Sequence, residues 1–390
     1  MSQKRNISEE DIQLKARMLS EGVNMSDMDL LRAFKENSQY GLRPFVLDES
    51  GMQVAFTPNK YSRLTMTLDG KKATVSDSGN ILGVGKLMEF PAWLDEPLSN
   101  GEPALSSINY YSPNVINLQM NNTCYNWKKG RQCRYCSLFA QNAVEFTHEK
   151  RLELAKLRAE TVKIAIDNGW HGVFIIGGGQ LSPHRRTEIL DRMEIFIEPI
   201  REAIGEEAFS KNPRVINNYP PKDLSEMEKW KERGISGTSF DVEIMDPAFF
   251  AAICPGKVAY APHEFWLESQ NASTEIFEWT TTGIVIGLEP MEGLLKGLEN
   301  RLMNGVLPLT FSWLPAPGST FEKHRPPNAE WILEYANKAA DFFVKHATQE
   351  MLDQITGKSD NPIFGGHQPY PPINIVGDFV KLRLLNEGKK

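Results

Sequence analysis

The sequence predicts an α/β protein in which parallel strands alternate with helices. Between residues 113 and 347, six strand-like segments are each followed by helix-like chain. Such alternation is typical of parallel strands joined by crossover helices. Glycine and polar clusters follow the carboxyl ends of the strands, where doubly wound sheets and barrels both place their active sites. Six such units fit either a doubly wound sheet or a partial barrel.

The expected strands are short apolar runs, several of which end in glycines or polar residues. They occupy residues 115–121, 172–179, 213–219, 236–244, 281–289 and 306–315. The segments between them carry helical spacing of apolar residues or charged helix starts. Helices are expected at residues 150–170, 185–204, 223–234, 290–305 and 328–347, with mostly helical chain from 245 to about 278.

The residues before position 113 lack the strand–helix repeat and are predicted to form an N-terminal extension to the core. Residues 8–37 show helical periodicity with an interruption at 24–27, and Ser8 begins a capping box. The alternation over residues 50–90, broken by an Asp-Gly pair, is typical of a small β-meander. Residues 91–112 are rich in proline, serine and asparagine, which favours a linker or a wrapping loop.

These differences divide the chain into three expected parts. An N-terminal extension of helices and a small β-meander covers residues 1–112, and the core covers residues 113–347. Residues 348–390 contain the stretch GGHQPYPPINIVG and are expected to form an irregular C-terminal wrap. The two extensions are available to cover the active-site end of the core.

Composition and charge narrow the class of protein. The chain is 41% hydrophobic and 24% charged, and its 43 basic and 50 acidic side chains give a net charge of −7. This mild acidity argues against a nucleic-acid partner. The polar N-terminus lacks the apolar core of a signal peptide, and no apolar run reaches about 18 residues. We therefore expect a cytoplasmic protein without a membrane partner.

Three of the four cysteines lie together in the stretch TCYNWKKGRQCRYCSLF. They are Cys124, Cys133 and Cys136, with the spacing C-x8-C-x2-C, directly after the first expected strand. A clustered, odd set of thiols does not fit the disulfide framework of a secreted protein. In a reducing compartment such a set more often binds a metal or takes part in redox chemistry.

Three explanations of this cysteine cluster remain open. A structural zinc site takes four ligands, so it would need Cys254 or a histidine such as His171 or His184. Unrelated buried thiols are the second explanation. The third is an iron–sulfur cluster held by three thiolates, which leaves one iron open to a small molecule. Tyr135 would then place its ring beside the cluster, where it can cover a flat ligand.

A strand, a three-cysteine loop that ends in Cys133-Arg134-Tyr135-Cys136 and repeated β/α units resemble the radical S-adenosylmethionine (radical SAM) superfamily. The resemblance covers roughly residues 113–345 and is strongest to the biotin-synthase-like branch. The usual spacing in that superfamily is C-x3-C-x2-C, from which the eight-residue first gap departs. The resemblance implies a partial (β/α)6 TIM-type barrel of parallel strands. It also implies a [4Fe-4S] cluster on Cys124, Cys133 and Cys136, with S-adenosylmethionine (SAM) as cofactor.

The resemblance also assigns cofactor-binding residues at two strand ends. Gly177, Gly178 and Gly179 match the Gly-Gly-Glu-like stretch, whose backbone meets the amino group of SAM. The simpler interpretation of these glycines is a strand–helix turn. Glu243 matches a polar position that meets the ribose or the amino acid part of SAM, and its simpler interpretation is a solvated carboxylate.

Two further positions would contact the adenine. Ile286 lies in a segment similar to the Gly-x-Ile-x-Gly stretch of the branch, and Pro315 lies in a turn similar to its last adenine-side turn. An arginine that often holds the SAM carboxylate has no counterpart in residues 254–270. Lys257 or His263 would substitute for it, although Lys257 also fits a solvated turn.

The expected substrate contacts follow the strand ends. They are Asn217, Asn218, Tyr219, Ser239, Asp241, Trp313, His184, Arg185 and Arg186, and the last three also fit a charged helix start. Trp127, Lys128, Lys129 and Arg131 in the longer cysteine gap are expected to shape a substrate pocket or to dock an electron donor. Cys254 is expected near the opposite face of the core in a structural role.

The resemblance implies an enzyme that reductively cleaves SAM to a 5′-deoxyadenosyl radical, which abstracts hydrogen from a small molecule. Cofactor or natural-product biosynthesis is the expected setting, with flavodoxin or ferredoxin as electron donor. An iron–sulfur electron-transfer protein without SAM chemistry and a zinc-stabilised α/β protein are the alternatives. The sequence contains no G-x-S-x-G, H-E-x-x-H or P-loop motif that would favour a hydrolase or nucleotidase.

Overall fold

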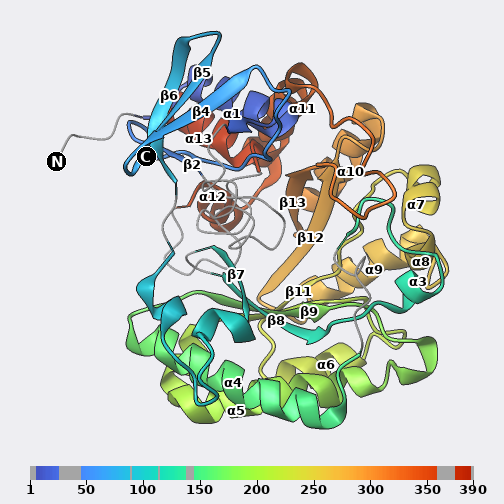
Figure 1. Cartoon of the computed structure of the whole chain (residues 1–390). Helices are drawn as coiled ribbons and strands as arrows, with labels where there is room; N and C mark the ends of the chain where they lie inside the picture. The colour runs from blue at the N-terminus through green and yellow to red at the C-terminus, as the bar shows by residue number, and fades with distance from the viewer. Residues whose placement is uncertain are drawn as a thin grey trace.

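A computed structural model provides the structure of the protein. It describes residues 6–25, 45–87, 90–112, 115–137, 145–357 and 374–387. Two sheets organise these residues: a strongly curved sheet in the middle of the chain and a smaller sheet near the N-terminus (Figure 1). The second helix expected after the interruption at 24–27 falls almost wholly in residues 26–44, outside the described ranges.

The curved sheet has seven strands in the order β13-β12-β11-β10-β9-β8-β7. Its six parallel strands are β8 (Val115–Asn121), β9 (Val173–Gly178), β10 (Arg214–Asn217), β11 (Gly237–Ser239), β12 (Trp279–Ile286) and β13 (Leu307–Ser312). Each strand lies beside the next one in the chain, whereas a doubly wound sheet reverses its strand order. The predicted partial (β/α)6 barrel is therefore confirmed, and the doubly wound alternative is wrong.

Helices cover the outer face of this sheet (Figure 1). They are α4 (His148–Asp167), α5 (Glu188–Lys211), α6 (Glu226–Glu232), α9 (His263–Thr274), α10 (Met291–Met303) and α11 (Ala329–His346). Alternate strand residues divide between two apolar cores, because successive side chains of a strand point to opposite faces. Ile116 and Phe174 belong to the core beneath α4 and α5, whereas Val115 and Ile175 belong to the core on the other face.

One strand of the curved sheet lies in the segment expected to be a linker or loop. Residues 91–112 contain two 3-10 turns, Ala92–Asp95 and Ala104–Ser107, followed by β7 (Asn109–Ser112). β7 pairs antiparallel with β8, with Asn109 opposite Asn117. It thereby satisfies backbone groups that the edge strand β8 would otherwise leave unpaired.

The smaller sheet has the order β1-β4-β5-β6-β2-β3. Its strands are β1 (Asn24–Met25), β2 (Phe45–Leu47), β3 (Gln53–Val54), β4 (Leu64–Asp69), β5 (Lys72–Asp77) and β6 (Asn80–Leu87). β4, β5 and β6 pair antiparallel in sequence, as expected for a meander. The turn between β4 and β5 passes through Gly70 at φ 58°, which glycine adopts without steric cost.

Helix α1 (Glu9–Glu21) begins with the predicted capping box. Asp11 N donates to Ser8 Oγ at 3.3 Å, and Ser8 N donates to Asp11 Oδ2 at 3.1 Å. An aspartate thus fills the position that glutamate or glutamine usually takes. The same helix carries Lys15, which lies buried and donates to Asp378 Oδ2 at 2.6 Å and to the Asn374 carbonyl at 2.9 Å.

The C-terminal part contains two helices where an irregular wrap was expected. α12 (Gln349–Thr356) and α13 (Val376–Asn386) pack on each other, and α13 also packs on α11. A glycine and β-branched residues obscure the helical pattern of α13 in the sequence. A Cβ at Gly377 would overlap the Ile355 carbonyl, so glycine is needed for the close approach of the two helices. None of the described helices combines the length and apolar character needed to cross a membrane.

Candidate active site

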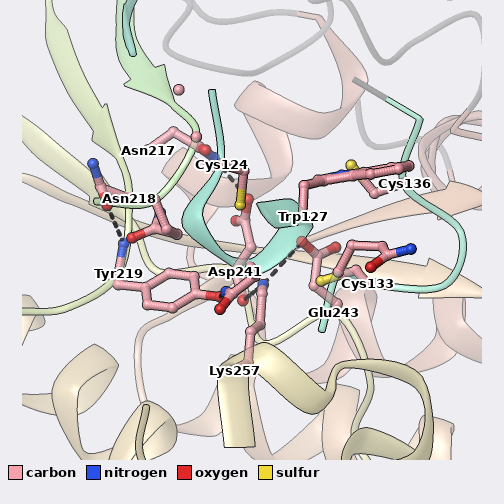
Figure 2. A pocket seen from close by; sticks show the side chains of 15 residues that line it. Cys124, Trp127, Cys133, Cys136, Asn217, Asn218, Tyr219, Asp241, Glu243 and Lys257 are labelled. Atoms are coloured by element: carbon pink, nitrogen blue, oxygen red, sulfur yellow. Dashed lines mark hydrogen bonds and ion pairs between the residues drawn. The ribbon is translucent and has the colours of Figure 1, made fainter. Parts of the chain in front are cut away.

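The three clustered cysteines line one cavity of about 120 Å³ at the carboxyl ends of the barrel strands. Figure 2 shows Cys124, Cys133 and Cys136 around this cavity, with Asn217 and Asp241 entering it from the ends of β10 and β11. None of the four cysteines of the chain forms a disulfide. The cavity therefore combines thiols from one loop with polar side chains from neighbouring strand ends.

The eight-residue gap between the first two cysteines contains one helical turn, α3 (Tyr125–Lys128). Asn126 fixes this turn, because its Nδ2 donates to Tyr219 Oη at 2.8 Å and its carbonyl accepts from Arg131 N at 2.8 Å. The Tyr125 amide donates to the Gln180 carbonyl at 2.8 Å. The gap is thus an ordered part of the wall, and Trp127 lines the cavity, as expected for a pocket-shaping residue.

The glycine run after β9 allows the cysteine loop to approach the sheet. A Cβ at Gly178, whose φ is 138°, would lie 2.6 Å from the Asn121 carbonyl, and one at Gly179 would overlap the Thr123 carbonyl. Both residues line the cavity, whereas Gly177 faces the Asn217 backbone. These glycines therefore serve a close backbone contact and also leave part of the cavity wall without side chains.

Glu243 is held in a strained backbone conformation beside the cavity. Its φ is 70°, and non-glycine residues in such regions cost about 1–3 kcal/mol. Two backbone bonds to β12 hold it there: its amide donates to the Gly283 carbonyl at 2.9 Å, and its carbonyl accepts from Val285 N at 2.8 Å. The expected strand over 236–244 is therefore a short strand, β11, followed by an isolated bridge at Glu243.

The Glu243 side chain forms a largely buried ion pair, so it is not a solvated carboxylate. Lys257 Nζ lies 3.0 Å from Glu243 Oε1, and the two side chains are 6% and 17% exposed. Burial raises the pKa of Glu243, although the charge of Lys257 opposes this shift. Burial works against the charge of Lys257, but Glu243 and the Cys133 sulfur raise its pKa overall. Lys257 thus brings a positive charge to the cavity wall.

Asp241 accepts hydrogen bonds from three residues near the ends of neighbouring strands. Its carboxylate accepts from Asn217 Nδ2 at 2.7 Å, Ser239 Oγ at 2.6 Å and Gly283 N at 2.7 Å. Asn217 and Asp241 line the cavity as expected, while Ser239 donates to Asp241 from outside the wall. The network therefore fixes the relative positions of β10, β11 and β12 at the cavity.

Several residues that the sequence singled out lie outside the cavity wall. Tyr135 is half-buried and packs, like Cys133, against the apolar core inside the barrel, outside the cavity wall. Ile286 is buried in the apolar core at the end of β12, and Pro315 is half-buried after β13. Trp313 is also buried. Adenine contacts by Ile286 and Pro315 stay predictions.

The charged start of α5 is engaged with other parts of the protein. Arg185 Nη1 lies 2.9 Å from Glu145 Oε1, and its Nε lies 2.9 Å from Glu188 Oε1. The Arg186 guanidinium stacks over Tyr260 at 3.6 Å from the ring centroid. His184 is exposed, and none of the three arginine and histidine side chains lines the cavity. These contacts favour the structural interpretation of a charged helix start.

Cys254 lies beside the cysteine loop, so its expected place near the opposite face is wrong. The helix after Glu243, α7 (Pro247–Ile253), is short, and the chain then turns into α8 (Pro255–Val258). Arg134 N donates to the Ile253 carbonyl at 3.0 Å, which joins the chain next to Cys133 to the chain next to Cys254. A helix from Asp246 to Cys254 was expected to run away from the site, whereas the end of α7 lies against the cysteine loop at Arg134.

The wall also contains polar atoms that sequence patterns did not reveal. Trp127 Nε1, Gln132 Oε1 and Asn218 Nδ2 are buried and have no hydrogen-bond partner within the described part of the chain. Unpaired buried polar atoms are costly, so they indicate a site that receives polar groups of a ligand. Asn126, Gln132 and Gln180 carry no motif, and only the three-dimensional fold brings them to the cavity.

An open β/α barrel with a thiol-lined cavity at its carboxyl edge has the architecture of a barrel enzyme. A comparison with models of known protein families finds no match. Among curated proteins, the chain is 37% identical over 403 residues to a bacteriochlorophyllide c C-7(1)-hydroxylase from Chlorobaculum limnaeum. That similarity covers 100% of this chain and 98% of the relative.

Solved structures give weaker similarities. A methylornithine synthase has a TM-score of 0.44 and 16% identity over 60% of this chain and 63% of its own. Coproporphyrinogen III oxidase from Escherichia coli, a radical SAM enzyme, has a TM-score of 0.41 and 14% identity over 62% and 55%. The chain thus spans less than two thirds of these solved chains.

Identity over the full length of the hydroxylase decides the family. The chain belongs to the family of this hydroxylase. The protein is accordingly an enzyme.

Proposed function

We propose that the protein is a radical SAM hydroxylase that acts on a methyl group of a chlorin-type tetrapyrrole. The observation that carries this proposal is the 37% identity along the whole chain to an enzyme named for hydroxylation of bacteriochlorophyllide c at C-7(1). A biosynthetic role follows from the same relationship. The substrate class is larger and flatter than the small molecules expected in general for this superfamily.

The residues present fit a [4Fe-4S] cluster held by three thiolates. Cys124, Cys133 and Cys136 line one cavity, and thiolate is the usual ligand of such clusters. Within the described ranges, no three His, Cys, Asp or Glu side chains converge on a single metal ion. The thiols of a four-iron cluster bind separate irons, so convergence on one point is not required. His171 and His184, considered for zinc, do not line the cavity.

The other wall residues fit SAM. Gly178 and Gly179 leave backbone exposed to the cavity. Lys257, which is ion-paired with Glu243 in the same wall, would take the place of the missing arginine as the cation near a carboxylate. Asn218 Nδ2 and Gln132 Oε1 have no hydrogen-bond partner among the residues that the structure describes. When bound, the cluster and SAM supply one-electron cleavage of SAM and a carbon radical able to abstract hydrogen from an unactivated methyl group.

The protein itself contributes orientation and exclusion of water. The α3 turn, fixed by Asn126, and the Asp241 network hold the two sides of the cavity at a constant separation. Fixed walls place a reacting carbon within reach of one C–H bond and reduce side reactions with solvent. Conversion of a methyl to a hydroxymethyl group consumes one water and one SAM. It releases 5′-deoxyadenosine, methionine and one proton. The one electron used to cleave SAM is recovered when the substrate is oxidised, so no net electron is consumed.

A one-electron donor such as flavodoxin or ferredoxin completes the proposal. Lys128 and Lys129 are exposed at the end of α3, directly beside the cluster loop. Their charge would attract an acidic donor protein. Free thiols of this kind suit a reducing compartment such as the cytoplasm.

Anaerobic reconstitution tests the proposed function. The protein is loaded with iron and sulfide, reduced with dithionite, and supplied with SAM and bacteriochlorophyllide c in H₂¹⁸O. We expect 5′-deoxyadenosine and a product heavier by one ¹⁸O atom. A cluster without SAM cleavage, in the presence of this substrate, would indicate electron transfer only. Tight zinc without a cluster would indicate the zinc-stabilised alternative.

A further inference from the structure

Arg186, just before α5, carries a positive charge that no carboxylate in the described part of the chain neutralises. Its neighbour Arg185 differs, because it is ion-paired with Glu145 and Glu188, each at 2.9 Å. Arg186 is half-buried, and its Nε is enclosed without a hydrogen-bond partner among the described residues. Enclosing a cation without a counter-charge costs the fold free energy, so this position needs an explanation beyond packing.

Two tyrosine rings hold the guanidinium of Arg186. Its central carbon lies 3.6 Å from the ring centroid of Tyr260 and 5.2 Å from that of Tyr219, and the two centroids are 5.1 Å apart. A cation–π contact engages the face of a guanidinium, whereas its five N–H donors point outward in its plane. The stacking that fixes Arg186 before the helix therefore leaves donors available for an anion.

Lys222 adds a second cation to the same aromatic group. Its Nζ lies 4.2 Å from the Tyr260 ring centroid and donates to the Tyr260 carbonyl at 2.6 Å. Burial and the charge of Arg186 both lower the pKa of Lys222. Two like charges beside one ring repel each other, so the arrangement favours binding of an anion.

These cations lie at the active-site end of the barrel. Arg186 follows the glycine run after β9, and Tyr219 follows β10. Tyr219 lines the cavity and accepts from Asn126 Nδ2 of the cysteine loop at 2.8 Å. Arg186 does not line the cavity itself, but a ligand that extends out of the cavity past Tyr219 would meet its guanidinium.

We propose that Arg186 binds the free carboxylate of the tetrapyrrole substrate and thereby sets which edge of the macrocycle faces the cavity. This role rests on the proposed function, because a chlorophyllide-type tetrapyrrole is a free acid with its carboxylate on a side chain at the rim of the ring. Paired N–H donors of arginine match the two oxygens of a carboxylate. Lys257, the cation of the described cavity wall, is already ion-paired with Glu243.

Binding of the free acid and of its methyl ester tests this role. Bacteriochlorophyllide c or its methyl ester is titrated into reconstituted protein with SAM and without reductant, and binding is followed by absorbance. The wild type should bind the acid about ten- to a hundredfold more tightly than the ester, as expected for hydrogen bonds to a charged group. Arg186→Gln should bind both compounds with the wild-type affinity for the ester. Arg185→Gln removes the same charge one residue away and should keep the wild-type discrimination.

SAM also has a carboxylate, so its affinity is measured in parallel by equilibrium dialysis. We expect the same SAM affinity in the wild type and in Arg186→Gln. An affinity lowered about tenfold in Arg186→Gln, with discrimination between acid and ester intact, would assign Arg186 to SAM and overturn the proposed role.

The remaining outcomes are equally decisive. Equal binding of acid and ester by the wild type overturns the role of Arg186, as does wild-type discrimination in folded Arg186→Gln. If Arg186→Gln does not fold, Arg186→Lys replaces it, because lysine keeps the charge but lacks the paired donors. That variant should bind the acid several-fold more weakly, and unchanged binding contradicts the role. Failure of the wild type to bind either compound would instead refute the proposed function.

Discussion

The backbone of Gly256 approaches the side chain of Asn126 so closely that a Cβ at position 256 would overlap the Asn126 amide. The same Cβ would lie 2.5 Å from the Arg131 carbonyl. Gly256 belongs to α8, and Asn126 belongs to the turn inside the long cysteine gap. A glycine on one element thus determines how closely the cysteine loop can pack.

Gly256→Ala should displace the α3 turn and lower cluster loading. Overpacking of this kind costs about 1–3 kcal/mol. We expect lower iron content after reconstitution and a lower midpoint of urea unfolding. Gly293→Ala on α10 is the matched control, because its Cβ would have no neighbour closer than 3.9 Å. Wild-type iron content in Gly256→Ala would contradict the assigned contact.

Cys124→Ala, Cys133→Ala and Cys136→Ala should each abolish 5′-deoxyadenosine formation. Removal of one of three ligands leaves the proposed cluster with two, which cannot hold it stably. The measurements are iron content, the EPR signal of the reduced protein and chromatography of the SAM products. Substantial SAM cleavage in any one of these variants would remove that residue from the ligand set.

Glu289 should make the protein less stable as the pH rises from about 4.5 to about 7. Burial raises its pKa to about 7 from an ordinary 4.5, so the folded state binds a proton that the unfolded state has released. The stabilisation is complete below the unfolded pKa and is lost as the pH passes the folded pKa. The shift corresponds to about 3 kcal/mol, at about 1.4 kcal/mol per pKa unit.

Urea unfolding of the wild type and of Glu289→Gln at pH 5 and pH 8 measures this effect. Glu289 accepts from Met245 N at 2.8 Å and Asp246 N at 2.6 Å, so glutamine loses one of these bonds at every pH. The variant should therefore be less stable throughout but should lack this contribution to the pH slope. Equal slopes in the two proteins would contradict the assignment to Glu289.

Asp241→Asn should lower kcat tens-fold. Loss of the charge weakens bonds from Asn217 and Gly283, and hydrogen bonds to charged groups contribute about 1.5–3 kcal/mol each. The new side chain would also have an NH₂ group in place of one carboxylate oxygen. This group cannot accept the hydrogen bond from Asn217 or from Gly283 that the oxygen accepts. Steady-state kinetics of methyl hydroxylation measure the change, with Ser239→Ala as a milder comparison that removes one neutral donor. If the Asp241→Asn variant has the same kcat as the wild type, the hydrogen bonds to the Asp241 carboxylate do not order the cavity.

The barrel was predictable because its signals are local and repeated. Each strand is an apolar run followed by helical spacing, and the order of the six units fixes a singly wound sheet once they pair. The glycines after β9 could be predicted as a site of close backbone approach. The partner of that approach could not, because Thr123 and Asn121 become neighbours only when β8 and β9 pair.

The features that were not predicted share one physical cause: each depends on contacts between residues far apart in the sequence. β7 is too short to show alternation and is recruited by the open edge of β8. Cys254 was misplaced because the end of α7 packs against the cysteine loop, a contact between residues 118 positions apart that no local pattern indicates. The left-handed conformation of Glu243 likewise depends on bonds to Gly283 and Val285 from another strand, and nothing in its own neighbours indicates it.

The buried pair of Lys15 and Asp378 has a consequence for the order in which the chain assembles. The two residues are 363 positions apart, so this ion pair cannot form until the chain has been synthesised as far as Asp378. Domains form as the chain emerges, and contacts between distant residues close slowly. During translation the contact between Lys15 of α1 and Asp378 of α13 therefore forms after all strands of the barrel have been synthesised. Closure of this contact is then a late event in folding.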